Sequence, residues 1–290
     1  MSTWIEVALN GPWGKGRQPH APIAVADIIR EGIAAARAGA AIIHCHAYDE
    51  ATGRQNDDAD TYARIIEGIR AEVDALVYPT LPLAGSGLTG VAATPAERFA
   101  HVKALAARGL IEMTVVDPGS VNFTRRDGGG QPEPGFVYLN PEADTLEGLA
   151  LCEAAKLTPS YAIYEPGFTR AGAALAARFP GLLAPLYRFM FSDQFAWGFP
   201  PRDYALDAHL RLLAEEAPGA TWMVAGLGVD IAPLIPFAVE RGGHVRVGLE
   251  DAPFGSSISN VAQVEAAVRL VHQAGSEPAT AQEVRAGLRA

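Results

Sequence analysis

Short apolar runs alternate with longer amphipathic stretches along this 290-residue chain, and this alternation limits the fold more than any other feature. A repeated strand and helix is the pattern of a parallel sheet with helical crossovers. Eight such units predict an α/β fold, the closed (β/α)8 TIM barrel; an open doubly wound sheet is the alternative, which periodicity alone does not exclude. The predicted strands span residues 4–9, 40–46, 75–80, 112–117, 161–165, 183–191, 221–226 and 244–250. The predicted helices span residues 23–38, 59–71, 94–108, 142–156, 168–178, 204–216, 230–241 and 259–274.

The residues that connect the predicted helices to the following strands are consistent with a barrel. Glycine directly follows three predicted helices, as it does where a left-handed residue ends a helix, at Gly39, Gly109 and Gly242. A TIM barrel takes about 250 residues. Residues 1–290 are therefore expected to form a single TIM-barrel domain, with a short extra C-terminal helix at about 279–289. The run 128–130, three glycines near several prolines, predicts a long loop after the fourth strand.

Composition indicates which partners to expect. A formal net charge of -10 argues against a surface built for nucleic acid, because phosphate backbones select for basic patches. Two basic spots, Lys15 with Arg17 and Arg125 with Arg126, can still receive an anion or be ordinary surface charge. No signal pattern or long uncharged apolar stretch is present, which predicts a cytoplasmic protein with small-molecule partners and no membrane partner.

The two cysteines are too few for a disulfide framework. Cys45 lies inside a predicted strand and is most simply a small buried residue, and Cys152 falls on a predicted helix.

Two histidines end the second predicted strand. Side chains of an extended chain alternate between faces, so His44 and His46 point the same way and Cys45 points the other way. Active sites of TIM barrels lie at the C-terminal ends of the strands. Of the seven histidines, only these two close a strand. The last strand reads HVRVGLED, which places Glu250 at the same end of the barrel, two strands from the histidines once the barrel closes.

Two imidazoles and a carboxylate are a standard zinc set, and they leave a coordination position open for substrate or water. Iron or manganese suits the same set. The competing interpretation is that both histidines are core residues satisfied by the backbone. Arg246, on the inner face of the last strand, needs carboxylate partners. It either forms a structural salt bridge with Glu250 or Asp251, orients Asp251, or binds a substrate carboxylate.

Other polar residues follow predicted strands and are expected at the same mouth of the barrel: Asn10, Thr80, Ser120, Asn122, Glu165, Ser192 and Asp193. The run AGLG at 225–228, with Gly226 and Gly228, precedes the seventh helix. It is either a phosphate site at a helix N-terminus or only a tight turn.

With these motifs in place, the chain resembles the β-keto acid cleavage enzymes, the family of the 3-keto-5-aminohexanoate cleavage enzyme. The likeness rests on AGAAIIHCHAYDEATGR, PGSVNF, ATWMVAGLG, GGHVRVGLED and SNVAQVEAAVRL, in this order, over about residues 5–287. It implies a zinc-containing TIM barrel and homo-oligomer that condenses a β-keto acid with acetyl-CoA and releases acetoacetate and a new acyl-CoA.

The resemblance also implies roles for residues. His44, His46 and Glu250 correspond to zinc ligands, Arg246 and Asp251 to a catalytic pair with Asp251 as general base, and Ser120, Asn122 and Thr80 to substrate contacts. The match departs at the specificity pocket. Several members carry a glutamate that contacts a substrate amine where this chain has Trp13, which indicates a flatter or more apolar acyl group, although Glu165 or Asp193 can still accept a cation.

Two other classes stay open. An amidohydrolase-type zinc hydrolase also uses HxH in a barrel, but it expects the motif on the first strand and further histidines at the ends of middle strands. A metabolite-binding barrel that kept the metal and lost turnover is the second.

Overall fold

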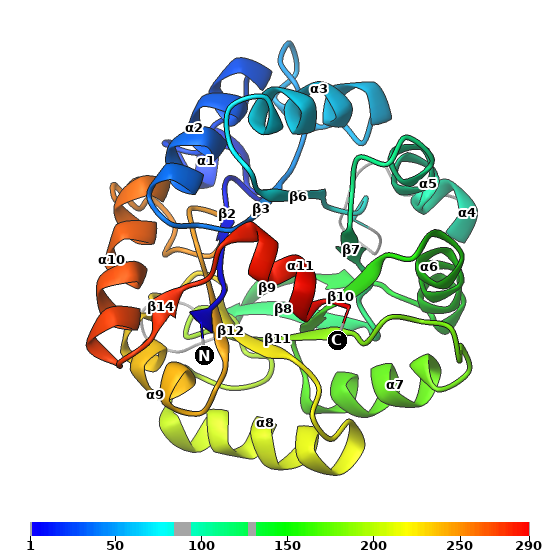
Figure 1. The fold of residues 1–290 in the computed structure, drawn as a ribbon, viewed down its shortest axis with the longest axis vertical. Coiled ribbons are helices and arrows are strands. Elements are labelled where there is room, and N and C mark those ends of the chain that lie inside the picture. Colours follow the sequence, from blue (N-terminus) through cyan, green and yellow to red (C-terminus); the bar gives the residue numbers. More distant parts are fainter. Residues whose placement is uncertain (1, 84–93, 127–131, 290) are drawn as a thin grey trace.

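The computed structural model describes residues 2–83, 94–126 and 132–289, and its core is an eight-stranded parallel sheet that curls into a barrel. The sheet order is β6-β3-β2-β13-β12-β11-β10-β7, and β6 and β7, the two ends of this order, contact each other (Figure 1). The TIM barrel predicted from the sequence is confirmed. Its strands are β2 (Ile5–Ala8), β3 (Ile42–Cys45), β6 (Leu76–Pro79), β7 (Met113–Val115), β10 (Thr158–Ile163), β11 (Leu186–Phe191), β12 (Trp222–Gly226) and β13 (His244–Val247).

Long helices such as α2 (Val25–Arg37), α3 (Ala59–Arg70) and α10 (Asn260–Gln273) surround the barrel, because each buries apolar side chains on one face and leaves polar side chains on the other. Helix starts are set locally: Asp58 caps one helix by accepting from the Thr61 amide, and Ser259 caps another at the Ala262 amide. Gly39, Gly109 and Gly242 have positive φ, as the helix-end prediction requires. The helices are α1 (Gly14–Arg17), α2 (Val25–Arg37), α3 (Ala59–Arg70), α4 (Pro95–Arg98), α5 (Ala100–Ala107), α6 (Glu142–Ala155), α7 (Pro166–Ala176), α8 (Asp203–Glu216), η1 (Ala232–Leu234), α9 (Ile235–Glu240), α10 (Asn260–Gln273) and α11 (Ala281–Gly287).

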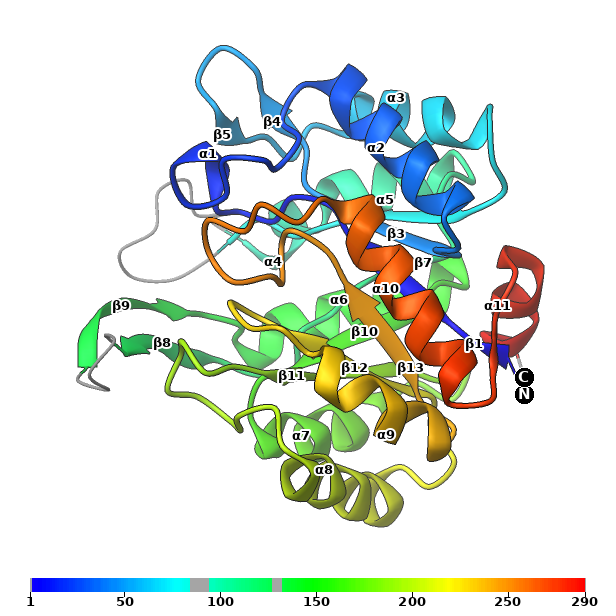
Figure 2. The same ribbon diagram turned by 90° about the vertical axis from the view of Figure 1, so that its left-hand side faces the viewer.

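The two ends of the barrel differ. At the N-terminal end of the strands, β1 (Ser2–Thr3) pairs in parallel with β14 (Glu277–Pro278), and α11 lies across the opening (Figures 1 and 2). At the C-terminal end, β4 (Tyr48–Asp49) pairs with β5 (Arg54–Gln55), and the hairpin of β8 (Val121–Arg126) and β9 (Pro132–Tyr138) extends away from the barrel (Figure 2). Loops therefore build up the end of the barrel where the predicted site lies.

The segment after the fourth barrel strand was predicted as a long loop, and this is wrong for most of it. Residues 121–126 and 132–138 form an antiparallel hairpin, whereas the glycine run 128–130 lies outside the described residues. Gly135 is required there, since a Cβ would lie 1.8 Å from the carbonyl oxygen of Phe123. The prolines and glycine that indicated a loop belong to a distorted edge strand, where such residues are tolerated.

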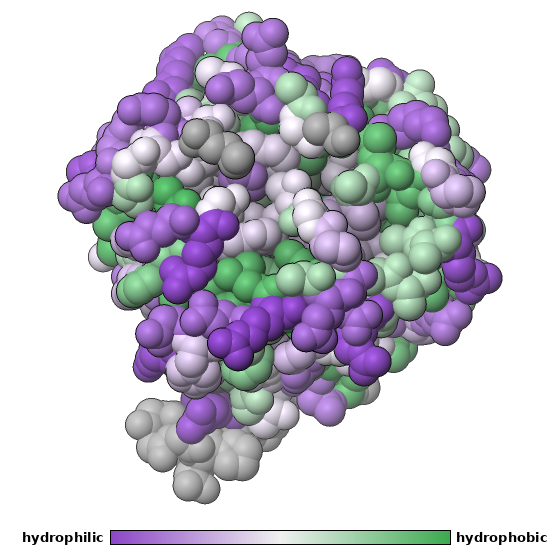
Figure 3. Space-filling model, turned by 60° about the horizontal axis from the view of Figure 1, so that its bottom comes forward, coloured by the Kyte–Doolittle hydropathy of each residue, from purple (hydrophilic) through white to green (hydrophobic). Residues whose placement is uncertain are grey.

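The surface combines both polarities. The face in Figure 3 is mostly hydrophilic, with a hydrophobic area toward its middle. In the described ranges, none of the helices has the length and apolar character that spanning a membrane requires. Large apolar side chains that the structure leaves exposed are Leu139, Tyr204, Phe237 and Ile258.

Candidate metal centre and active site

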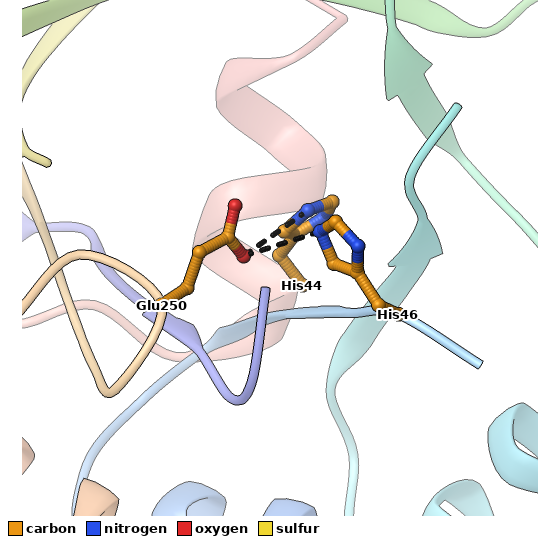
Figure 4. A group of neighbouring side chains, drawn as sticks. All are labelled: His44, His46 and Glu250. Carbon is orange, nitrogen blue, oxygen red and sulfur yellow. Dashed lines mark ion pairs between the residues drawn. The ribbon is translucent and has the colours of Figure 1, made fainter. Parts of the chain in front are cut away.

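His44 and His46 lie at the C-terminal end of β3, and both imidazoles point at the carboxylate of Glu250 (Figure 4). The Nε2 atom of each histidine is 3.5 Å from Oε2 of Glu250. One potential ligand atom from each of the three residues lies within 4.8 Å of the other two, and all three side chains are buried. Residues more than 200 positions apart in the chain meet because β13 is two strands from β3 in the sheet.

Neighbouring groups hold the cluster in place. Nδ1 of His46 is 2.9 Å from Oε1 of Gln55, so an Nδ1–H donor leaves the Nε2 lone pair facing Glu250. The backbone of His46 is fixed by the side chain of Asn10, which accepts from its amide and donates to its carbonyl, both at 2.9 Å. Gly11 packs against the side chain of Glu250, where a Cβ would lie 2.6 Å from Cγ.

The donor atoms fit a cation. Nε2 of His46 and Oε2 of Glu250 are buried and have no hydrogen-bond partner among the described residues, although they lie 3.5 Å apart. Buried polar atoms without partners are costly, and a cation between them satisfies both. Burial lowers the pKa of His44, with Arg246 adding to this, which favours the neutral imidazole that metals bind. Burial opposes ionisation of Glu250, but Arg246 and the two histidines hold its pKa well below the usual value.

Arg246 joins three carboxylates. Its Nε and Nη2 pair with the two oxygens of Asp251 at 2.8 and 2.9 Å. Nη2 also contacts Oε1 of Glu250 at 2.9 Å, and Nη1 contacts Oε1 of Glu6 at 3.1 Å. The guanidinium thus orients Asp251, and four of its five N–H donors face carboxylates, which leaves no donor fork for a substrate carboxylate. Burial raises the pKa of Asp251 to about 6, against the opposing effect of Arg246.

A cavity opens above the cluster at the C-terminal end of the barrel. Its floor holds His44, His46, Glu250 and Arg246, together with a second buried arginine, Arg188 of β11. Its walls are largely aromatic, and Phe123 packs against three of the other rings. The aromatic wall residues are Trp13, Phe123, Phe136, Tyr138 and Tyr164.

Of the residues that the sequence predicts to contact the substrate, only some lie at this cavity. Thr80 lines the cavity. Ser120 and Asn122 are exposed, and neither is among the described residues that line it. They belong to the hairpin and the turn before it, and alternation along β8 turns Val121 and Phe123 inward and Asn122 outward.

Two further expected contacts have structural partners. The carboxylate of Glu165 accepts the Gly198 amide at 3.1 Å, and Asn10 is buried beneath His46. Ser192 Oγ donates to the Leu227 carbonyl at 2.7 Å, and Asp193 is half exposed near Arg202. None of these four is among the described residues that line the cavity.

Gly226 and Gly228 lie in a tight turn, but the helix after them starts later than the sequence indicated, with η1 at Ala232. Gly228 has a φ of +67°, and a Cβ there would lie 2.5 Å from Oε1 of Gln194. The neighbouring amides are occupied, because Leu227 donates to the Phe191 carbonyl. Close packing explains these glycines, and phosphate binding at the turn stays a prediction.

Trp13 occupies the mouth of the cavity. Its Nε1 donates to the backbone carbonyl of Glu250 at 2.8 Å, and its ring meets Phe254 edge to face. Arg17 of α1 and Arg125 of β8 both lie over the Phe254 ring, at 5.6 and 5.9 Å from its centre. The structure therefore brings together one arginine from each basic spot in the sequence.

A second cavity, of about 470 Å³, lies between α9, α10 and the loop after β13. Asp251 lines this cavity and Arg246 lines both. Phe254, beneath the two arginines, also lines it.

Sequence reasoning missed three charged residues of the site: Glu6, Asp117 and Arg188. The signal was present for Arg188, because a charged residue in the apolar strand LYRFMF must either pair or line a cavity. Glu6 is buried in IEVA in the same way. Asp117 accepts from Tyr138 Oη at 2.6 Å, a contact that depends on the unpredicted hairpin.

Comparison with known proteins gives one consistent result. The sequence model of the family described as beta-keto acid cleavage enzyme matches residues 2–289. The 3-dehydrocarnitine:acetyl-CoA trimethylamine transferase of Rhizobium meliloti is 27% identical, with 94% of this chain and 91% of the relative covered. The 3-keto-5-aminohexanoate cleavage enzyme of Fusobacterium nucleatum is 30% identical, with 93% and 91% covered. In fold, the chain is similar to the apo structure of ObcA, with a TM-score of 0.72 at 18% identity, over 94% of this chain and 66% of that one.

Proposed function

Because the chain belongs to the beta-keto acid cleavage enzyme family, we propose that it condenses a β-keto acid with acetyl-CoA and releases acetoacetate and a new acyl-CoA. The observation that carries this proposal is the cluster of His44, His46 and Glu250, which lines one cavity together with Arg246, and the pairing of Arg246 with Asp251. The two relatives are named for different keto acids, so family membership does not fix which keto acid this chain uses.

We propose zinc as the bound metal, with His44, His46 and Glu250 as its ligands. Two observations support this assignment. Nε2 of His46 and Oε2 of Glu250 are buried without a hydrogen-bond partner in the described part of the chain, and two imidazoles with a carboxylate are a donor set that zinc prefers. When bound, a divalent cation supplies the Lewis acid that stabilises negative charge on the ketone and carboxylate oxygens of the keto acid.

Asp251 is proposed as the general base that removes a proton from C2 of the keto acid. A pKa raised to about 6 leaves it mostly ionised near pH 7, yet basic enough to accept a proton. Arg246 orients it through two hydrogen bonds and cannot itself be the base. Asp251 lines the second cavity, and its partner Arg246 lines both cavities.

The remaining steps balance without a redox cofactor. The C2 carbanion attacks the acetyl carbonyl, a C–C bond forms, and the CoA thiolate leaves. The thiolate then adds to the C3 ketone, and the C2–C3 bond breaks to give the new acyl-CoA and, after protonation, acetoacetate. We assign the second cavity to the CoA arm, and Arg17 with Arg125 at its edge to CoA phosphates, because they are the cations that converge on its lining residue Phe254.

The test is a screen of β-keto acids with acetyl-CoA, in which acetoacetate and the new acyl-CoA are read by mass spectrometry, together with metal analysis of the purified protein. His46→Ala is expected to lose metal and activity together. Asp251→Asn is expected to keep metal and to lose rate by about 10²–10⁴-fold. His272→Ala, at a half-exposed histidine on α10, is the matched control.

Three results would contradict the proposal. Bound metal with no turnover of any keto acid would favour a metabolite-binding barrel. Hydrolysis of amides or lactones without acetyl-CoA would favour a hydrolase. Loss of metal from Asp251→Asn would show that this residue is a ligand rather than the base.

A homo-oligomeric state and a cytoplasmic location remain predictions from the sequence. The exposed apolar side chains of Tyr204 and Ile258 offer surface for contact between copies. Sedimentation of the purified protein tests the first prediction, and cell fractionation tests the second.

A further inference from the structure

Arg188 lies in the middle of β11 with its side chain in the barrel interior, where it is only 3% exposed. In the order of the sheet, β11 is four strands from β3, so in an eight-stranded barrel the two strands face each other across the interior. Arg188 lines the same cavity as His44 and Glu250. The floor of the cavity thus has the metal cluster on one side and a guanidinium on the other.

The contacts of Arg188 are neutral. Its Nε donates to Oγ of Ser160 at 2.8 Å, and its Nη2 reaches the Ser160 carbonyl at 3.5 Å. No carboxylate in the described ranges lies within ion-pair distance of it. The other two deeply buried arginines differ, since Arg246 pairs with three carboxylates and Arg98 pairs with Asp144 at 2.6 Å.

The acidic side chains of the interior are occupied by other partners. Asp117 accepts from Tyr138 Oη and from the Ala162 amide, at 2.6 and 2.9 Å. Glu6 accepts from Arg246 and from Tyr78 Oη. Burial penalises the charge of Arg188, and Glu6 and Asp117 offset this only through space, so, as far as the structure describes the chain, an anion that enters the cavity would be its first counter-ion in direct contact. A charged group retained at such a cost, and aimed into a cavity, is expected to recognise a ligand.

We propose that Arg188 binds a carboxylate at the far end of the keto acid, so that the substrate class is β-keto acids with a second carboxylate. The inference rests on the proposed function, in which the C1 carboxylate and the ketone face the His44, His46 and Glu250 cluster. The rest of the substrate then extends along the aromatic wall toward β11. A substrate with a cationic tail is disfavoured, because Arg188 and Arg246 both line this cavity.

The kinetic test compares a 3-oxo dicarboxylic acid with the 3-oxo monocarboxylic acid of equal length, each with acetyl-CoA. The wild type is expected to prefer the dicarboxylate by about 100-fold in kcat/KM, because the monocarboxylate would leave the buried charge of Arg188 without a partner. In Arg188→Met this ratio is expected to fall to near one or to invert, mainly through KM for the dicarboxylate. Arg188→Lys, which keeps the charge, is expected to restore part of the ratio. Arg30→Met, at an exposed arginine on α2, is expected to keep it.

A binding test needs no turnover. Glutarate, a dicarboxylate without the ketone, is expected to raise the Tm of the wild type and of Arg30→Met, but not that of Arg188→Met, while valerate raises none of them. Equal substrate ratios in wild type and Arg188→Met, or equal glutarate shifts, would overturn the assignment while leaving the proposed function intact. If the wild type turns over no keto acid at all, the proposed function fails, and the glutarate shift still decides whether Arg188 holds a carboxylate.

Discussion

Oε1 of Gln55 lies 2.9 Å from Nδ1 of His46, and this contact decides which nitrogen of the imidazole faces Glu250. Gln55 is itself held, because its amide donates to the carboxylate of Asp57 at 2.9 Å. The short β4–β5 hairpin that carries Gln55 therefore acts on the proposed metal site through one hydrogen bond.

Gln55→Leu is expected to weaken metal binding by about 10–100-fold, because the orientation of His46 is no longer fixed. The measurement is the zinc affinity against a competing chromophoric chelator. Arg54→Met, at the exposed neighbouring position of β5, is the matched control and should keep the affinity of the wild type. Equal affinity in wild type and Gln55→Leu would show that the contact does not position the ligand.

Gly11→Ala is expected to lower zinc affinity, because the new Cβ would lie 2.6 Å from Cγ of Glu250 and push the carboxylate out of place. The positive φ of 64° at this position adds strain of about 1–3 kcal/mol. Gly53→Ala separates the two effects, since Gly53 has a φ of +65° with no atom in contact range. The prediction fails if both variants bind zinc equally well.

Arg246→Met is expected to lower the free energy of unfolding by about 3–5 kcal/mol, since it leaves the buried carboxylates of Glu6, Glu250 and Asp251 without their cation. Glu6→Gln should cost less, because it removes one of three negative charges and keeps an acceptor for Arg246. Urea unfolding at pH 7 measures both. A larger loss from Glu6→Gln would contradict this account of the network.

His209 is expected to make stability depend on pH. It lies on α8, buried against the rings of Phe189, Phe191 and Phe199, and burial lowers its pKa to about 4. Between pH 6.5 and 4 the imidazole of His209 binds a proton in the unfolded chain but stays neutral in the folded chain. Stability is therefore lost as pH falls through this window, by up to about 3 kcal/mol, and is constant above it with respect to this residue.

Urea unfolding at several pH values tests this dependence. His209→Phe should be less sensitive to acid than the wild type by this amount, with His244, whose pKa burial lowers to about 3, accounting for part of the remaining slope. An unchanged slope in His209→Phe would exclude His209 as a source.

The barrel and the meeting of His44, His46 and Glu250 were predictable because each depends on local rules that the fold repeats. Alternation along β3 puts His44 and His46 on one face, and closure of a parallel barrel brings Glu250 within reach of both. The strand containing Thr158, Pro159 and Ser160 was placed too late in the chain, because these residues interrupt the apolar run.

The substrate contacts were harder, because they depend on the loops. Asn122 was expected at the barrel mouth, but it belongs to a hairpin whose pairing no periodicity indicated. A charged residue within an apolar strand must either pair with another charge or line a cavity. Arg246 was interpreted in this way, and Arg188 was missed although the same rule applies to it. Whether such a charge is paired depends on residues far away in the chain, and only the structure gives these.

β1 pairs with β14, and β2 pairs with β13, so the sheet cannot close during translation until the C-terminal part of the chain has been made. β2, the first barrel strand to be made, gains its second neighbour only when residues 244–247 have left the ribosome. Ser2 likewise pairs only after Glu277 has been made. Until then the two edges of the growing sheet expose backbone groups that other chains can pair with. A translation pause before residues 244–247 have emerged is therefore expected to leave these edges open and to favour aggregation.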